Sequence, residues 1–346
     1  MKKVLSGILI CAFIPALLPF AGIGCGDSEH KNNQVKGEFS IYLLTPLRHE
    51  ITQLGELDRC PEVTQSLSKL ELQDKPLLSV DDIDFYDFSS HCIYLKEERA
   101  VHISNIISGL FPTSSDTPFV VVANGERCYL GYFLSMLSSW LPMTPIIEGP
   151  IEVGLYPKDV IHIEQGFTSD RSFKDVRSDE RIKNALLESN KLSPGLQVEL
   201  NEVKIASRSD TTTLSYMFTI TDEDDNALYV PDPDKMGSSL FHYYTNGVYL
   251  INPNNPTASI GAENGTSNGP EPYDSWNVEW FTKLDSHQSM RRSVMQGGYP
   301  NIQSGTYNCG FIYSGPTNIE KSKRLLPDGR IWIGEVRSTS LTVTIE

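Results

Sequence analysis

The sequence predicts an α+β domain followed by an all-β domain. Before residue 195, helical and strand patterns are mixed, whereas nearly every later segment alternates between apolar and polar residues. Pro194-Gly195 interrupts the pattern where the composition changes. The length of 346 residues also exceeds what one hydrophobic core usually serves. We therefore expect domains at residues 38–195 and 196–346.

In the first domain the clearest local signal is a hairpin around Asn124-Gly125. Apolar runs flank this pair, and both residues tolerate the positive φ of a type I′ turn. A helix is expected over residues 178–192, capped by Ser178, with Ile182, Leu186 and Leu187 on one apolar stripe. Further strands are expected at 39–45, 91–96 and 160–163, with short helices at 61–72 and from Ser79 onward.

The second domain shows strand patterns over its whole length. The longest are residues 196–206 and 211–221, which alternate with period two. Residues 253–275 are rich in Pro, Gly and Asn and are expected to form a long loop. Regular short strands with turn signals between them indicate a β-sandwich. The other expected strands are 228–230, 241–245, 248–252, 277–284, 289–294, 307–313, 330–336 and 340–345.

Gly305-Thr306-Tyr307-Asn308-Cys309 resembles the G-x-Y-x-C segment of immunoglobulin domains. The resemblance implies an immunoglobulin-like sandwich in which the Tyr307 hydroxyl bonds backbone at a strand corner. Gln303 stands where that family has an acid, and residues 211–221 contain no partner cysteine. An inter-sheet disulfide is therefore not expected.

Residues 118–167 resemble the periplasmic head of the translocase subunit SecD. The resemblance lies in PFVVVANGE at 118–126, Pro145-Ile146-Ile147, Pro150-Ile151, Ile161 and Gly166-Phe167. It implies a ferredoxin-like module, an antiparallel sheet with helices on one face. The transmembrane helices of that subunit have no counterpart here, so its activity is not carried over.

The N-terminus has the pattern of an export signal, residues 1–24. Lys2 and Lys3 precede an apolar run that two prolines interrupt. The stretch that ends at Cys25 resembles the lipobox of bacterial lipoproteins, which implies acyl chains on Cys25 and attachment to a membrane. Gly22 stands where that family usually has Leu, and cleavage by ordinary signal peptidase is the alternative.

The tether after Cys25, residues 25–37, is polar and has no apolar periodicity. In a Gram-negative source, Gly26 in place of Asp implies sorting to the outer membrane. The remainder of the sequence contains no apolar run of the roughly 18 residues that a membrane helix needs.

A net charge of −15 argues against nucleic-acid binding, because an acidic surface repels phosphate backbones. The sequence also shows no Lys/Arg cluster that could form a local exception. The expected partners beyond the membrane are a protein, a glycan or a small molecule, and no cofactor is expected.

Four cysteines remain in the folded region after export. In an oxidising compartment they allow three disulfide pairings. We favour Cys60 with Cys92, since both lie in the less regular first third of the chain. Cys128 and Cys309 lie in strand-like runs, where buried free thiols are equally consistent with the pattern.

The sequence contains no catalytic motif and no histidine pair at metal-ligand spacing. Asp222, Asp224 and Asn226 form an acidic turn that could ligate calcium, but a solvated hairpin turn explains it as well and is favoured. No catalytic residue and no metal site are therefore assigned.

Tyr273 and Trp276 lie in and directly after the long loop. Exposed aromatic side chains beside a loop on a β scaffold commonly bind glycans or proteins. The sequence thus favours a lipid-anchored envelope protein that acts as a non-catalytic binding module. The alternative is an exported hydrolase of envelope glycan or peptide, with acids of the first domain in its site.

Overall fold

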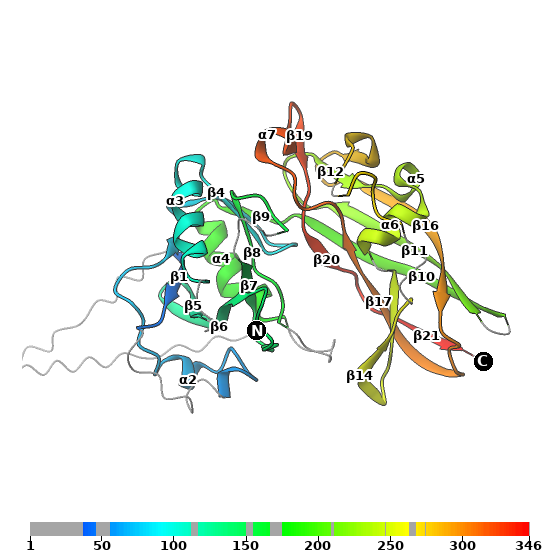
Figure 1. Cartoon of the computed structure of the whole chain (residues 1–346), viewed down its shortest axis with the longest axis horizontal. Helices are drawn as coiled ribbons and strands as arrows, with labels where there is room; N and C mark the ends of the chain where they lie inside the picture. The colour runs from blue at the N-terminus through cyan, green and yellow to red at the C-terminus, as the bar shows by residue number, and fades with distance from the viewer. Residues whose placement is uncertain are drawn as a thin grey trace, which may run out of the picture. The chain divides into compact units, whose positions relative to one another are not determined.

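The computed structural model describes nine segments of the chain: residues 37–45, 56–111, 117–149, 155–166, 175–208, 211–245, 247–262, 268–273 and 275–345. The expected signal peptide, Cys25 and the tether up to residue 36 lie outside them. The fold is mostly β, with several sheets (Figure 1). The described residues from 37 onward belong to one compact unit.

The first sheet has the strand order β2-β1-β5-β6-β7. Its strands pair antiparallel except β6 and β7, which are parallel. Alternate residues of β5 enter two different cores: Phe119 and Val121 lie in one, and Val120 and Val122 in the other. The sheet is therefore buried on both faces. Its strands are β1 (Phe39–Leu43), β2 (Leu78–Ser79), β5 (Thr117–Ala123), β6 (Glu126–Ser135) and β7 (Ile146–Gly149).

A second sheet has the order β8-β4-β3-β9 and shares one core with the first. Two helices, α3 (Glu97–Ser108) and α4 (Glu180–Glu188), contribute Ile103, Ile182 and Leu186 to that core. The smaller core on the other face includes Leu67 of α2 (Thr64–Leu67). The strands of the second sheet are β3 (Ile83–Asp87), β4 (Cys92–Leu95), β8 (Val160–His162) and β9 (Leu192–Ser193), and η2 (Val176–Ser178) precedes α4.

The hairpin predicted at Asn124-Gly125 is confirmed. Asn124 has φ of +50° and Gly125 of +79°, and β5 and β6 pair on either side of them. The predicted helix begins later than expected, because the carboxylate of Asp179, and not Ser178, caps it by accepting the N–H of Arg181.

The helix expected from Ser79 onward is wrong. The Asp82 carboxylate accepts the backbone N–H of Ser79 at 3.0 Å, which closes a turn between β2 and β3. Side chains of this kind stabilise turns as readily as helix starts, and the sequence signal is the same for both.

In the second part of the chain, two sheets pack face to face. One has the order β10-β11-β16, and the other has the order β14-β13-β17-β20, with β21 also paired to β17. Tyr216 and Phe218 of β11 meet Phe311 of β17 in the core between them. The strands are β10 (Leu196–Arg208), β11 (Thr211–Asp222), β13 (Val248–Asn252), β14 (Asn255–Ile260), β16 (Ser289–Tyr299), β17 (Gly305–Ser314), β20 (Glu335–Arg337) and β21 (Leu341–Ile345).

A further sheet, β15-β12-β19-β18, lies in the same part of the sequence. Its aromatic and aliphatic residues Phe281 and Ile331 share a core with Cys92 and Tyr94 of the first part. The strands are β12 (Leu228–Pro231), β15 (Phe281–Leu284), β18 (Leu325–Leu326) and β19 (Gly329–Ile331); the short helices are α5 (Pro233–Met236), η3 (Val278–Trp280) and α7 (Lys321–Arg324).

Two expectations for this part are wrong. Residues 241–245 form the end of a helix, α6 (Ser238–Thr245), which buries Phe241, His242 and Thr245. A run of five residues is too short for periodicity to separate helix from strand. The expected long loop at 253–275 also contains a strand, β14.

The bond implied by the immunoglobulin-like segment is present. The Tyr307 hydroxyl donates to the carbonyl oxygen of Gln303 at 3.0 Å. The expected disulfide is not formed, because Cys60 is exposed whereas Cys92 is fully buried inside β4, and both are free thiols. Cys128 and Cys309 are buried free thiols, as the alternative for these two proposed.

Across the described segments, no helix has both the length and the apolar character needed to span a membrane.

Candidate functional site

A cleft of about 650 Å³ contains both aromatic residues singled out in the sequence. Small-molecule sites commonly have volumes of about 300 to 1,000 Å³. Four parts of the chain line it: residues in and around β8, the end of α6 with the residues before η3, the end of β17 with the loop after it, and the start of β20.

Five aromatic side chains line this cleft. Tyr273, 75 % exposed, and Trp276, which packs edge-on against Phe281, are the two that the sequence indicated. The structure thus brings both predicted residues into one site. The other three are Tyr156, Tyr243 and Tyr244.

Hydrogen bonds hold the walls of the cleft together. The Thr317 hydroxyl donates to the carbonyl oxygen of Leu155 at 2.6 Å, and the Ser314 hydroxyl donates to that of Tyr244 at 2.5 Å. The Tyr156 ring lies against the imidazole of His162, with centroids 4.7 Å apart. These bonds hold the backbone next to Tyr156 and the backbone of Tyr244 against the loop after β17.

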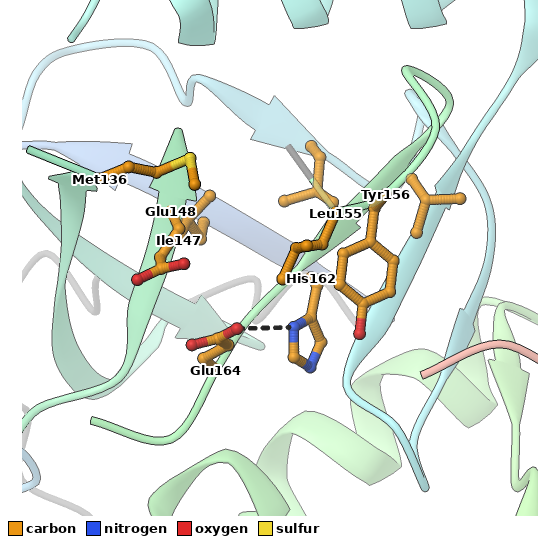
Figure 2. A pocket seen from close by; sticks show the side chains of 9 residues that line it. Met136, Ile147, Glu148, Leu155, Tyr156, His162 and Glu164 are labelled. Carbon is orange, nitrogen blue, oxygen red and sulfur yellow. Dashed lines mark ion pairs between the residues drawn. The ribbon is translucent and has the colours of Figure 1, made fainter. Parts of the chain in front are cut away.

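An acidic recess adjoins the cleft and shares Leu155, Tyr156, His162 and Glu164 with it (Figure 2). Ile146 and Glu164 form an antiparallel bridge, which places Glu148 opposite His162 on the same face as Glu164. The recess has a volume of about 40 Å³. A space of that size takes one or two water-sized groups, so only a small part of a ligand could enter it.

The two carboxyl groups of the recess differ in their electrostatics. Burial raises the pKa of Glu148, and the charge of Glu164 raises it further. Burial would also raise the pKa of Glu164, but contact with His162 and the charge of Arg177 outweigh burial and lower it. Glu164 Oε1 lies 3.7 Å from His162 Nδ1, whereas His162 Nε2 is buried without a hydrogen-bond partner.

The charge of the whole site is negative. Glu335 adds a carboxylate to the cleft beside Glu164. None of the described residues that line the cleft or the recess is Lys or Arg. The site therefore repels anionic ligands and suits neutral or cationic ones.

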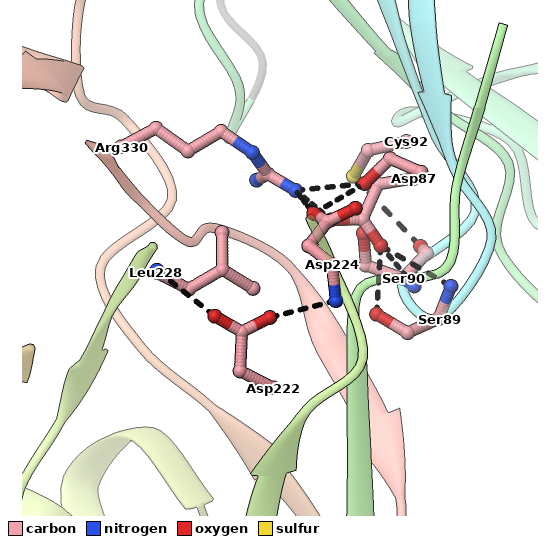
Figure 3. A network of polar contacts seen from close by, with 9 residues as sticks. Asp87, Ser89, Ser90, Cys92, Asp222, Asp224, Leu228 and Arg330 are labelled. Atoms are coloured by element: carbon pink, nitrogen blue, oxygen red, sulfur yellow. Dashed lines mark hydrogen bonds and ion pairs between the residues drawn. The ribbon is translucent and has the colours of Figure 1, made fainter. Parts of the chain in front are cut away.

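The acidic turn considered for calcium has its carboxylates engaged inside the protein (Figure 3). Asp222 accepts the backbone N–H groups of Asp224 and Leu228 at 2.8 and 3.1 Å. Asp224 accepts from the Ser193 hydroxyl at 2.6 Å and from Arg330 at 2.9 Å. In the described segments, no group of three or more His, Cys, Asp or Glu residues forms a cluster suited to a metal ion. Asn226, the third residue considered for calcium, has an uncharged amide side chain.

Arg330 is the centre of this buried network. Its Nη2 donates to Asp87 at 2.8 Å as well as to Asp224 and the Ser193 hydroxyl, and its guanidinium lies over the ring of Phe85. Arg330 is only 8 % exposed and Asp87 is fully buried. The network therefore joins residues from both halves of the sequence and stabilises the fold, but it offers no accessible surface to a ligand.

Sequence reasoning missed the residues of the first part that complete the site. Tyr156, His162 and Glu164 lie more than a hundred residues before Trp276. The alternation of His162 with Val160 and Ile161 showed only that it lay in a strand. No local sequence pattern indicated that this strand would border the cleft.

Comparisons with known proteins add little. No family model and no curated protein matches the chain. One solved structure that is similar is the X-ray structure of a Northeast Structural Genomics Consortium target, SoR45, at 10 % identity, over 43 % of this chain and 83 % of that one, with a TM-score of 0.21. A TM-score this low supports no argument about fold or function.

Proposed function

We propose that this chain is a lipid-anchored protein of the cell envelope that binds a glycan in the aromatic cleft without catalysing a reaction on it. The observation that carries the proposal is the gathering of five aromatic side chains and two carboxylates, with no Lys or Arg among the described lining residues, around a volume of about 650 Å³. Aromatic faces stack on the apolar faces of sugar rings, and carboxylates accept hydrogen bonds from hydroxyl groups.

The binding proposal is tested by calorimetric titration with soluble envelope-glycan fragments. Replacing Trp276 by Ala removes a stacking surface and is expected to weaken binding roughly tenfold or more, equivalent to about 1.4 kcal/mol. Trp140→Ala is the matched control, because Trp140 is also partly exposed but does not line the cleft. Equal affinity in the wild type and the Trp276 variant would refute the site.

The cellular location is a separate part of the proposal. It rests on the lipobox-like sequence that ends at Cys25, followed by a polar tether. Cys25→Ser is expected to move the protein from the membrane fraction to the soluble fraction and to abolish incorporation of labelled palmitate. Unchanged membrane association would contradict it. In a Gram-negative host, Gly26→Asp is expected to shift the protein from the outer to the inner membrane.

We also propose finer fold relationships. An immunoglobulin-like sandwich for residues 196–346 is supported by the two facing sheets and the Tyr307 bond to Gln303. A ferredoxin-like relationship for residues 38–195 is supported only by largely antiparallel sheets with α3 and α4 in their core. Each part determined experimentally and compared with those families tests this directly.

The second candidate function is a hydrolase of envelope glycan or peptide. The pair Glu148 and Glu164 favours it, since two neighbouring carboxyl groups with opposite pKa shifts are typical of an acid and a base. Incubation with the same glycans or with envelope peptides, followed by measurement of new reducing ends or amines, decides between the two. Product that disappears in Glu148→Gln would overturn the non-catalytic proposal.

A further inference from the structure

We propose that the loop after β6, residues 136–143, inserts apolar side chains into the surface of a lipid bilayer. The proposal rests on the proposed location at a membrane but not on the ligand of the aromatic cleft. Four features support it: the exposed apolar side chains of the loop, its lack of charge, the hydrogen bonds that its backbone makes within the loop, and its distance from the tether.

The loop exposes five large apolar side chains within eight residues. Leu137 is 95 % exposed, Leu141 is 61 % exposed and Met136 is 48 % exposed, while Trp140 and Met143 are each 36 % exposed. These are five of the thirteen exposed large apolar side chains in the described residues. Apolar side chains gathered on the surface in this way mark contact with a protein or with a membrane.

This part of the sequence carries no charge. Residues 128–147 contain no Asp, Glu, Lys, Arg or His, although 21 % of the chain is charged. An ionised side chain is costly inside a bilayer, so an uncharged stretch is what insertion requires. The chain as a whole has a net charge of −15 and repels anionic headgroups. Attraction to a bilayer must therefore come from apolar contact.

Backbone groups of the loop are bonded within the loop itself. The N–H of Ser138 donates to the carbonyl oxygen of Ser135 at 2.8 Å. The hydroxyl oxygens of the same two serines accept the N–H groups of Leu137 and Trp140, at 3.3 Å from Ser135 and 3.2 Å from Ser138. Unpaired backbone groups are costly in a bilayer. These bonds therefore lower the cost of moving the loop out of water.

Two side chains favour a bilayer over a protein as the partner. The ring of Trp140 packs edge-on against Tyr132, with centroids 4.7 Å apart, and remains partly exposed, as is typical of tryptophan at a membrane surface. Leu137, at 95 % exposure, has almost no contact with the rest of the chain. A protein partner would need a pocket shaped to this side chain, whereas a bilayer needs no complementary shape.

The tether is long enough for one bilayer to hold Cys25 and receive the loop. The described fold begins at Gly37, and the twelve residues between span up to about 40 Å when extended. Gly37 leads into β1, whose Phe39 pairs with Ala123 at the hairpin end of β5 and β6. The loop lies at the other end of β6, which has ten residues and a length of about 30 Å.

Flotation with phosphatidylcholine vesicles tests the proposal without the lipid anchor. The protein is the mature chain, residues 25–346, with Cys25→Ser. We expect it to float with the vesicles, and we expect the double variant Leu137→Ser, Leu141→Ser to lower the partition coefficient roughly tenfold or more. Leu187→Ser is the matched control, because Leu187 is 60 % exposed but lies on α4. Added phosphatidylglycerol should not strengthen binding, since the chain is acidic.

Tryptophan fluorescence provides a second measurement. Phosphatidylcholine brominated on its acyl chains is expected to quench the wild type, and Trp140→Phe is expected to remove most of this quenching. Quenching that persists in Trp140→Phe would overturn the proposal, because another part of the chain would then enter the bilayer. The substituted side chains are exposed, so the circular dichroism spectra should match that of the wild type.

The outcomes separate this proposal from the lipid anchor. Absence of flotation, or equal flotation of the wild type and the double variant, would overturn the bilayer contact and leave the anchor intact. Absence of labelled palmitate from the wild type would overturn the anchor, whatever the vesicles show. If the protein does not float but sediments as a dimer that the double variant abolishes, a second copy covers the loop and the bilayer contact is wrong.

Discussion

Replacing Arg330 by Met is expected to lower the free energy of unfolding by about 3 to 5 kcal/mol. Arg330 donates from one nitrogen to Asp87, Asp224 and Ser193 at 2.8, 2.9 and 3.0 Å. Both acids are buried, with exposures of 0 and 6 %. Methionine preserves much of the apolar packing over Phe85. It leaves two buried carboxylates without a cation, and uncompensated buried charge strongly destabilises the folded state.

Urea denaturation followed by tryptophan fluorescence measures this loss. The matched control is Lys204→Met, because Lys204 pairs with Glu202 at 2.8 Å on the surface, and its side chain is 72 % exposed. Exposed pairs contribute about 0 to 1 kcal/mol, so the control should change little. The triple variant that also carries Asp87→Asn and Asp224→Asn is expected to recover part of the loss. A loss below about 1 kcal/mol for Arg330→Met would refute the argument that this pair is desolvated.

Three further predictions concern stability. Burial lowers the pKa of His91 well below its ordinary value of 6.5, and the charge of Arg177 lowers it further. As pH falls below 6.5, His91 therefore binds a proton in the unfolded chain but not in the folded one, which lowers the free energy of unfolding. Between pH 7 and 5 the wild type should therefore lose more stability than His91→Asn in urea titrations, by up to about 2 kcal/mol, and parallel losses would contradict this. Asn is chosen because His91 has φ of +52°. Gly125→Ala should lower the free energy of unfolding by about 1 to 2 kcal/mol, because Gly125 has φ of +79° and no atom lies within 4 Å of an added Cβ. Gly261→Ala, where an added Cβ is equally unobstructed but φ is not positive, should be neutral in the same assay. Equal effects of the two substitutions would refute the conformational cause. Leu186→Ala, on the buried face of α4, should lower the free energy of unfolding by about 2 to 5 kcal/mol. Leu187→Ala, where the side chain is 60 % exposed, should lower it by less than about 0.5 kcal/mol. Comparable shifts in melting temperature for the two variants would show that the burial is misassigned.

Features with short-range causes could be predicted from the sequence. The turn at Asn124-Gly125 depends on two residues that accept positive φ, and the pairing of β10 with β11 depends on period-two alternation within each strand. The bond from Tyr307 to Gln303 spans only four residues. In each case the physical cause lies within one hairpin or one corner.

Features that depend on distant partners could not be predicted. The helix α6 covers the core through Phe241, although the same five residues suit a strand. Cys60 and Cys92 carry no local sign that one is exposed and the other buried. In the site, Tyr273 and Trp276 could be proposed from composition, but Tyr156 and His162 join them only through tertiary packing.

The most direct test of the binding cleft is an experimental structure of the chain with a bound envelope-glycan fragment. We expect a sugar ring against Trp276 and Tyr273, with carboxylates of the cleft accepting hydrogen bonds from its hydroxyl groups. A glycan bound on another surface, with the cleft unchanged between the free and the bound protein, would contradict the account.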